Sequence, residues 1–320
     1  MASDVSDRTN RVSVVMAAYN AAGTVAEATQ SALSQDIDEI ELLVCDDAST
    51  DKTAEILSAQ HDARMRVLVN DSNLGPGLSR DKAIDHATAP WIALIDADDA
   101  WHPGRLHRLL AAADSTGADV IFDDTLLCHD AGGRLVHWRR LHGPSAFGGN
   151  GTSPRLVRVE DYIVSDRLLI QPLMRKSMIH THGVRHSSRR FAEDAEFYLR
   201  LALAGAKFCY VPEPLYYYRI TPGSLTAQAK DPSLMRQCLE ACAQWKGWSP
   251  SVQSAFQTKI DSLHVNEAMY DLAGAVRGRR FGRAARLLAA EPRLLARLPR
   301  SLFRQLVYQV HRFTHGGSGR

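Results

Sequence analysis

The sequence has 320 residues, of which 45% are hydrophobic and 23% charged, and its formal net charge is +2. This composition is that of an ordinary globular protein, long enough for one large domain with an appendage or for two domains. The small charge excludes binding of polyanions by bulk charge alone. No apolar run approaches the roughly 20 residues that span a bilayer, and the polar N-terminus has no signal-peptide pattern. Five scattered cysteines without a CxxC pair predict buried thiols in a reducing cytoplasm.

The first 125 residues alternate between strand-like and helix-like segments. Continuous apolar runs, typical of strands buried on both faces, lie at 12–18, 40–47, 65–70, 91–97 and 118–124. Segments with helical spacing and capping residues lie between them, at 24–35, 49–60, 77–87 and 102–117. Alternation with short links predicts a mostly parallel sheet that is covered by helices on both faces.

The pattern is looser after residue 124. A Gly-rich loop at 143–154 is either a lid or substrate loop, or a surface insertion. Residues 191–205 predict a helix with acidic residues in its first turn, and 207–220 predict two short strands joined at a proline-marked turn. From about residue 231 the chain is predicted to be helical, and 279–317 is dense in arginine and leucine.

Polar residues follow several of the predicted strands, where ligands bind in open α/β sheets. Tyr19 is suited to packing against a flat base, and Asp47 to accepting a hydrogen bond from a ring N–H or a sugar hydroxyl. On an extended strand, Asp96 and Asp98 would project the same way and suit a hard divalent cation. A lone DxD is more typical of a solvated turn or a helix cap. Its position beside the other two strand ends favours a site for a nucleotide diphosphate.

The chain resembles a known family through five segments that occur in the family's order. They are VSVVMAAYN, LLVCDDASTD, NLGPGLSRDKAIDHA, WIALIDADDAWHPGRL and EDAEFYLRLALAG. Over about residues 11–226 it resembles family-2 glycosyltransferases of the GT-A fold, in particular those of bacterial exopolysaccharide and lipopolysaccharide synthesis. The resemblance implies an α/β fold with a Rossmann-like, mostly parallel sheet flanked by helices.

The resemblance also implies an organisation into parts. A GT-A catalytic domain would span residues 1–227, with a nucleotide-sugar half at about 11–125 and an acceptor half at about 126–227. A basic helical C-terminal region would follow at 228–320.

The implied reaction is inverting transfer of a sugar from a nucleotide-sugar, usually a UDP-sugar, with Mn²⁺ or Mg²⁺. The acceptor would be a hydroxyl of a glycan or lipid-linked saccharide in bacterial polysaccharide biosynthesis. One carboxylate must take the hydroxyl proton, and a cation must neutralise the leaving diphosphate. Carried over by motif, the roles are base binding for Ala17, Tyr19 and Asp47, a nucleotide contact for Arg80, the ribose side for Asp96, and the metal for Asp98.

The general base in this resemblance is Asp194, with Glu193 beside it. Their place in the first turn of a helix favours the ionised form of Asp194, although such acids are also typical of ordinary helix starts. Two departures from the family stand out. Ala17 and Ala18 replace a common Pro and Thr, and Thr221 replaces the His of YRxHxxS. Arg219 or Ser224 would then substitute for that His near the diphosphate.

Several other side chains have two readings. Trp101 would pack either on the sugar or in the core. His180, His182 and His186, spaced as alternate residues, could bind a metal on a strand. They are more typical of residues that border an acceptor pocket or lie in solvent, and His182 is the candidate acceptor contact.

The basic C-terminal stretch also has two readings. Its arginines, interleaved with leucines, are Arg279, Arg280, Arg283, Arg286, Arg293, Arg297, Arg300 and Arg304. Such helices either lie on an anionic membrane surface, here the inner face of the plasma membrane, or present a solvated face. The expected location is cytoplasmic in both cases. Nucleic acid is not expected as a partner, because no aromatic stacking platform accompanies the arginines.

Two rival functions make different demands on the sequence. A nucleotidyltransferase predicts a Gly-rich phosphate loop with a basic residue after the first strand, where this chain reads AAYNAAGT. A catalytically idle nucleotide-sugar-binding assembly protein would be expected to lose the DxD or the Glu193–Asp194 pair, and both are present.

Overall fold

The computed structural model describes residues 10–131, 135–149, 151–165, 168, 170–220 and 233–297. The first part of the chain contains β1 (Val12–Ala18), α1 (Val25–Leu33), β2 (Ile40–Asp46), α2 (Thr53–Ser58), β3 (Met65–Val69), α3 (Pro76–His86), β4 (Trp91–Leu94), β5 (Ala100–Trp101), α4 (Arg105–Thr116) and β6 (Val120–Asp130). The second part contains β7 (Leu135–Arg140), the 3-10 turn η1 (Ala146–Gly148), β8 (Arg155–Val157), α5 (Val159–Val164), β9 (Leu173–Arg175), α6 (Lys176–Thr181), α7 (Glu193–Leu203), β10 (Phe208–Arg219), α9 (Ser233–Ala243), α10 (Pro250–Arg277), α11 (Phe281–Ala290) and α12 (Arg293–Arg297).

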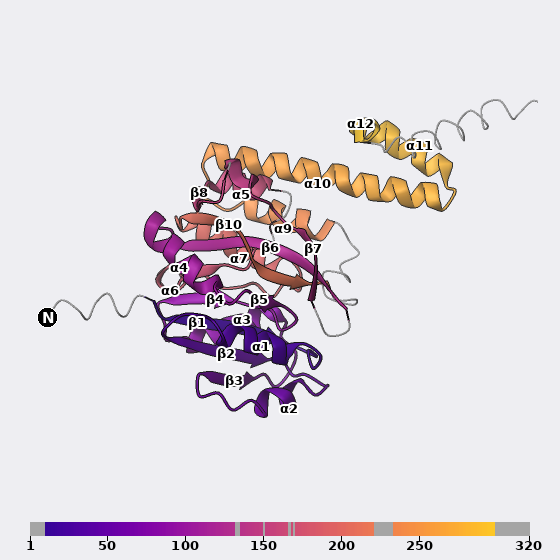
Figure 1. Cartoon of the computed structure of the whole chain (residues 1–320). Coiled ribbons are helices and arrows are strands. Elements are labelled where there is room, and N and C mark those ends of the chain that lie inside the picture. Colours follow the sequence, from indigo (N-terminus) through magenta and orange to yellow (C-terminus); the bar gives the residue numbers. More distant parts are fainter. Residues whose placement is uncertain are drawn as a thin grey trace, which may run out of the picture.

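A single sheet organises these elements, in the strand order β3-β2-β1-β4-β9-β6-β10-β5, with β7 beside β6 and β8 beside β10. The four strands β1 to β4 pair in parallel, as the alternating pattern predicted. The sheet as a whole is mixed, because β9 inserts antiparallel between β4 and β6. Figure 1 shows β1 to β4 as one end of the sheet and β6 and β10 as the other.

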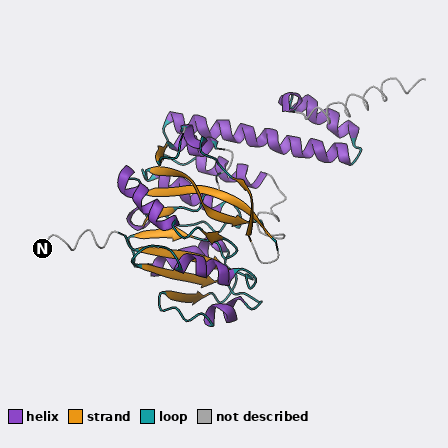
Figure 2. Cartoon of the chain, viewed as in Figure 1, coloured by secondary structure: helices purple, strands orange, loops and turns teal. Residues whose placement is uncertain are grey.

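Helices cover both faces of the sheet and create two apolar cores. Alternate residues of β1 serve opposite faces: Met16 belongs to the core that includes residues of α1 and α4, whereas Val15 belongs to the core that includes residues of α3 and α7. Burial on both sides explains why these strands read as continuous apolar runs. Figure 2 shows the helices on the two sides of the strands.

The C-terminal helices divide into a packed part and an arm. Residues of α9 and of the first half of α10, among them Cys238, Leu239 and Phe256, belong to the same core as α7. The second half of α10 instead carries α11 and α12, and these helices share a separate small cluster built on Leu272, Ala284 and other residues. We call residues 265–297 the arm, which extends away from the sheet in Figure 1. Within the described ranges, no helix combines the length and apolarity needed to cross a bilayer.

The structure differs from the predictions at several places. The fourth strand ends at Leu94 rather than at residue 97. The segment predicted as two short strands forms one strand, β10 (Phe208–Arg219), whose pairing with β6 shifts between Val211 and Tyr216, where Pro212 and Pro214 lack an N–H to donate. Residues 135–140 extend the sheet as a hairpin with β6, and 176–181 form a helix rather than a strand.

Candidate functional site

The site begins at the turn that follows β4. The Asp99 N–H donates to the Asp96 carbonyl over 3.1 Å, which closes a tight turn over residues 96–99. The two carboxylates of the DxD therefore leave a turn, and the prediction of an extended strand at Asp96 and Asp98 is wrong. Asp96 and Asp98 are half-buried, whereas Asp99 is fully buried.

Asp99 anchors this turn to β10. Its carboxyl accepts hydrogen bonds from the Tyr216 hydroxyl at 2.6 Å and from the Arg219 N–H at 2.8 Å. The same hydroxyl accepts the Asp96 N–H at 3.2 Å. Burial, followed by the negative charges of Asp98 and Asp96, raises the pKa of Asp99 well above its usual value. Asp99 therefore acts as a structural carboxyl beneath the other two.

Arg80 on α3 joins the turn to the start of α7. Its guanidinium donates to Asp96 Oδ1 at 2.5 Å and to Glu193 Oε1 at 3.2 Å, and it is buried. Gln171 donates to the other oxygen of Asp96 at 2.8 Å. Two carboxylates that are 97 positions apart in the chain thus share the Arg80 guanidinium. Arg80 consequently connects the first residue of the DxD motif to the first residue of the acidic pair.

Asp194 follows Glu193 in the first turn of α7 and is half-buried. Burial and then the charge of Glu193 raise its pKa to about 7, although Arg80 acts to lower it. The helix N-terminus, which was expected to favour the ionised form of Asp194, acts in the opposite direction to burial. A pKa near neutrality is the value that suits a general base at physiological pH.

Gly77 allows α3 and α7 to approach each other at this point. A Cβ on Gly77 would lie 2.9 Å from the His186 Cβ and 3.0 Å from Glu193 Cγ. His186 is buried there, with Nδ1 at 2.7 Å from Asp81 and its ring stacked on Phe197 at 4.0 Å. The missing side chain at Gly77 therefore gives Glu193 the room to reach Arg80.

The residues predicted to bind the base lie at the ends of β1 and β2. Tyr19 is 49% exposed and Ala17 is half-buried, so both can be approached. Asp47, in contrast, is 2% exposed and accepts three hydrogen bonds at 2.8 Å, from Asn70 Nδ2 and from the N–H groups of Leu74 and Gly75. Asp47 holds the loop before α3 in the structure, and its contact with a base stays a prediction.

Other predicted contacts fall in different places. Trp101 is 3% exposed, with the Arg105 guanidinium 4.6 Å from its ring centroid, so it packs in the core and not on a sugar. Arg219 is buried and bonded to protein groups, and its substitution for the missing His near a diphosphate stays a prediction. Ser224 and Thr221 lie outside the described residues.

The three histidines do not form a set. His180 and His182 lie on and after α6, a helix that begins beside the amino-terminal end of β4, opposite Asp96. Both are exposed, whereas His186 is buried against Asp81. The alternate spacing was read as a strand, and the helix removes that basis for a metal site. The acceptor contact of His182 stays a prediction.

The donor chemistry of the turn fits a hard divalent cation. In the described part of the chain no three His, Cys, Asp or Glu side chains form a group able to enclose a metal. Mg²⁺ and similar ions are commonly bound by one or two protein carboxylates together with substrate phosphates and water. Asp96 and Asp99 of this turn are engaged by Arg80 and Tyr216, and the contact of Asp98 with such an ion stays a prediction.

Two residues of the site were missed in the sequence: Tyr216 and Gly77. Their partners are distant in the chain, as the 120-residue separation between Asp96 and Tyr216 illustrates. A single sequence carries no periodic signal for such contacts. The GLS segment at the start of α3 could have drawn attention to Gly77, since a glycine inside a helix costs stability and so calls for a packing reason.

Comparison with known proteins gives the same fold and a family. The succinoglycan biosynthesis protein ExoO of Rhizobium meliloti is 41% identical over 118 residues, which are 37% of this chain and 34% of that protein. ExoU of the same organism, also a succinoglycan biosynthesis protein, is 30% identical over 238 residues, 70% of this chain and 66% of its own length. The matches thus span about a third and just under two thirds of these relatives.

A solved structure of S. aureus TarS 1-349 in complex with UDP-GlcNAc superposes with a TM-score of 0.65 at 20% identity, and covers 80% of this chain and 73% of that one. This likeness establishes the GT-A glycosyltransferase fold. A family model described as glycosyl transferase family 2 matches residues 13–183, more than half of the chain. The chain therefore belongs to glycosyl transferase family 2.

Proposed function

We propose that this protein is an inverting, metal-dependent glycosyltransferase that moves a sugar from a UDP-sugar to a saccharide hydroxyl during polysaccharide biosynthesis. The observation that carries the proposal is the Arg80 bridge, because it unites a carboxylate turn with a carboxylate pair in one cluster. The reaction requires the turn that binds the sugar donor and the carboxylate that acts as base to lie close enough to act on the same pair of reactants.

Each carboxylate has one role in the proposed reaction. Asp194 takes the proton from the acceptor hydroxyl as that oxygen attacks the anomeric carbon from the face opposite the diphosphate. Asp98 would hold a Mn²⁺ or Mg²⁺ ion, which supplies the positive charge that the leaving diphosphate needs. Asp96, fixed by Arg80 and Gln171, faces the ribose side of the nucleotide. Glu193 keeps Arg80 in place, and its charge adds to the effect of burial in raising the pKa of Asp194 to about 7.

Two observations support UDP as the nucleotide of the proposed donor. The ring of Tyr19 at the end of β1 is exposed, and some relatives and structural neighbours have names or titles that mention UDP-sugars. TarS was crystallised with UDP-GlcNAc. A flat, half-exposed aromatic ring can stack on a base without selecting the sugar. The acceptor, in line with the family resemblance, is a glycan or a lipid-linked saccharide.

The reaction is tested with a panel of UDP- and GDP-sugars in the presence of Mn²⁺ or Mg²⁺, with donor hydrolysis and thermal stabilisation as readouts. A ligand that binds only the native state raises the melting temperature, so the correct nucleotide is found even without an acceptor. Asp194→Asn should keep UDP binding and lose about 1000-fold of turnover.

Asp85→Asn, which changes an exposed carboxylate on α3, is the matched control and should keep wild-type turnover. Full activity of Asp194→Asn, or a wild-type protein stabilised by no nucleotide, would refute the proposed reaction.

We also propose that the arm rests on an anionic membrane surface. Arg277, Arg279, Arg280 and Arg286 are exposed on or between α10 and α11, and Leu295 is 51% exposed nearby in the chain. Exposed cations beside apolar side chains suit a surface of acidic lipid. The protein should pellet with vesicles of phosphatidylglycerol at low salt and not with phosphatidylcholine. Arg279→Glu with Arg280→Glu should release it, and unchanged pelleting of that variant would contradict the proposal.

A further inference from the structure

Arg219, the last residue of β10, makes an unusually complete set of contacts around the turn that follows β4. Its backbone N–H donates to Asp99 Oδ1 at 2.8 Å, and its Nε donates to the Asp98 carbonyl at 2.8 Å. Nη1 donates to Asp130 at 2.5 Å and Nη2 to Glu27. One buried side chain therefore connects the turn to α1 and to the end of β6.

These contacts leave Arg219 poorly placed to act on a diphosphate. It is 4% exposed, and each of its guanidinium nitrogens has an assigned protein acceptor. Both acidic partners are about half exposed, at 48% for Glu27 and 46% for Asp130, so they are surface carboxylates that hold the arginine from outside. Moving the guanidinium toward a substrate would break these contacts together.

We propose that Arg219 is a positioning residue for the divalent cation, and that it fixes the Asp98 carboxylate by holding the peptide carbonyl of the same residue. This inference rests on the proposed function, since it takes Asp98 as the metal ligand. The clamp consists of Arg219, Glu27 and Asp130, together with the two bonds that Arg219 makes to the turn.

The physical reason is the geometry that a small hard cation demands. Its ligands must be held to within about 0.5 Å of the productive position. The position of a side chain on a turn varies with any movement of the peptide groups on either side of it. Arg219 restrains both sides of Asp98, through the carbonyl of Asp98 and the carboxyl of Asp99. Loss of such an outer contact weakens metal binding about 10- to 100-fold in metalloproteins.

A binding experiment that does not depend on turnover distinguishes this positioning role of Arg219 from a direct contact between Arg219 and the diphosphate. The affinity of full-length protein for UDP is measured by calorimetry without metal and with saturating Mn²⁺, and Mn²⁺ is titrated by electron paramagnetic resonance in the presence of UDP. Arg219→Met should weaken Mn²⁺ binding at least 10-fold, while UDP binding without metal stays within twofold of wild type. Arg139→Met, an exposed arginine on β7, is the matched control and should change neither.

The outer contacts give a second test in case Arg219→Met fails to fold. Glu27→Gln with Asp130→Asn keeps the arginine and its bonds to the turn but removes both charges that hold it, and should weaken Mn²⁺ binding by a smaller factor, about threefold to tenfold. Unchanged Mn²⁺ affinity in a folded Arg219→Met protein, or a loss of metal-free UDP binding instead, would overturn the inference. A wild-type protein whose UDP binding ignores Mn²⁺ would instead overturn the proposed metal dependence.

Discussion

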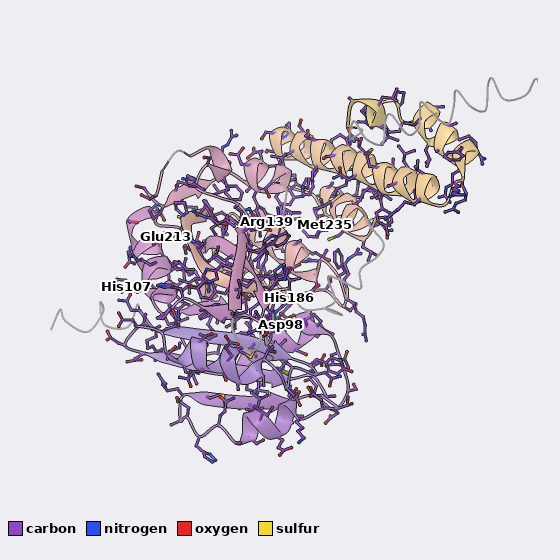
Figure 3. All side chains as sticks on the ribbon, turned by 45° about the vertical axis from the view of Figure 1, so that its right-hand side comes forward. Asp98, His107, Arg139, His186, Glu213 and Met235 are labelled. Carbon is purple, nitrogen blue, oxygen red and sulfur yellow. The ribbon has the colours of Figure 1, made fainter. Side chains whose placement is uncertain are left out.

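The carboxylate cluster and the arm use charged side chains in opposite ways. Around Asp96 and Glu193 the charges are buried and shared, so that one guanidinium serves two carboxylates from distant parts of the chain. On the arm, arginines such as Arg277 and Arg286 are exposed. Ion pairs among the arm's described residues, such as Arg283 with Asp271 at 3.5 Å and Arg293 with Glu291, are local contacts between exposed or half-exposed groups. Figure 3 shows Asp98 near the middle of the molecule, far from the arm's helices.

This difference predicts which substitutions should have large effects on stability and activity. Breaking a buried ion pair leaves an uncompensated charge in a poorly solvated place, whereas surface pairs contribute little to stability. A single substitution in the cluster should therefore lower both the stability of the protein and its turnover. A substitution on the arm should change only the binding of whatever the arm contacts.

The largest effect is expected from Arg80→Met, because it strands two carboxylates. We predict a loss of about 3 kcal/mol in the free energy of unfolding and at least a 100-fold loss of turnover. Urea unfolding and donor hydrolysis measure the two quantities. Arg108→Met, at an exposed arginine on α4 with a 3.7 Å pair, should change neither. Equal behaviour of the two variants would remove the contrast between buried and exposed charge.

The pH dependence of turnover is the next largest effect. Since the pKa of Asp194 lies at about 7 and the base must be ionised, the rate should fall about tenfold per unit below pH 7. The stability has the opposite sign: this carboxyl holds its proton in the folded state and loses it at a lower pH when unfolded. The free energy of unfolding contributed by Asp194 is therefore highest at acid pH and declines as the pH rises from about 4 to 7.

Asp194→Asn tests both slopes at once. It should abolish the acid limb of whatever turnover remains and flatten the pH dependence of stability across that window. Chemical denaturation at several pH values gives the second measurement. A wild-type acid limb centred near pH 4 would show that burial does not set the ionisation of this carboxyl.

Gly77→Ala should have a moderate effect on the same cluster. The new methyl group would press on the His186 Cβ and Glu193 Cγ, and we expect a loss of about 1–3 kcal/mol together with reduced turnover. Gly104→Ala is the control, because its Cβ would meet nothing closer than 3.6 Å. If both glycines tolerate alanine equally, the close approach of α3 and α7 is not needed at the site.

The smallest effect is predicted for the arm. Replacing Arg277 and Arg286 together by Gln should alter the free energy of unfolding by less than about 0.5 kcal/mol and leave donor hydrolysis unchanged. The fraction of this variant that sediments with anionic vesicles at low salt should nevertheless be lower than that of the wild type. A drop in donor hydrolysis in this variant would mean that the arm communicates with the cluster.

The sequence predicted the half of the fold in which local pattern decides the structure. Buried parallel strands and their helices are visible as apolar runs and amphipathic spacing, and β1 to β3 end within a residue of the prediction. The second half depends on pairings such as β9 between β4 and β6, which no local pattern encodes. The histidines around 180 failed for a related reason, because alternation in a short segment does not distinguish a strand from a helix.

The candidate site divides in the same way. Asp96, Asp98, Glu193 and Asp194 were found from motifs, and the structure places the first and third on one arginine. The pKa of Asp194 could not be predicted, since it depends on burial that only the folded chain creates. The true neighbours of Arg219 were equally hidden, because its contacts reach back 192 residues to Glu27.

The most direct test of the whole account is equilibrium binding of UDP to the wild-type protein and to Asp98→Asn, each with and without Mn²⁺. We predict that Mn²⁺ tightens UDP binding to the wild type at least 10-fold and leaves binding to Asp98→Asn unchanged, with both proteins equally folded. The same Mn²⁺ enhancement in both proteins would contradict the assignment of this turn as the place where the donor's diphosphate is held.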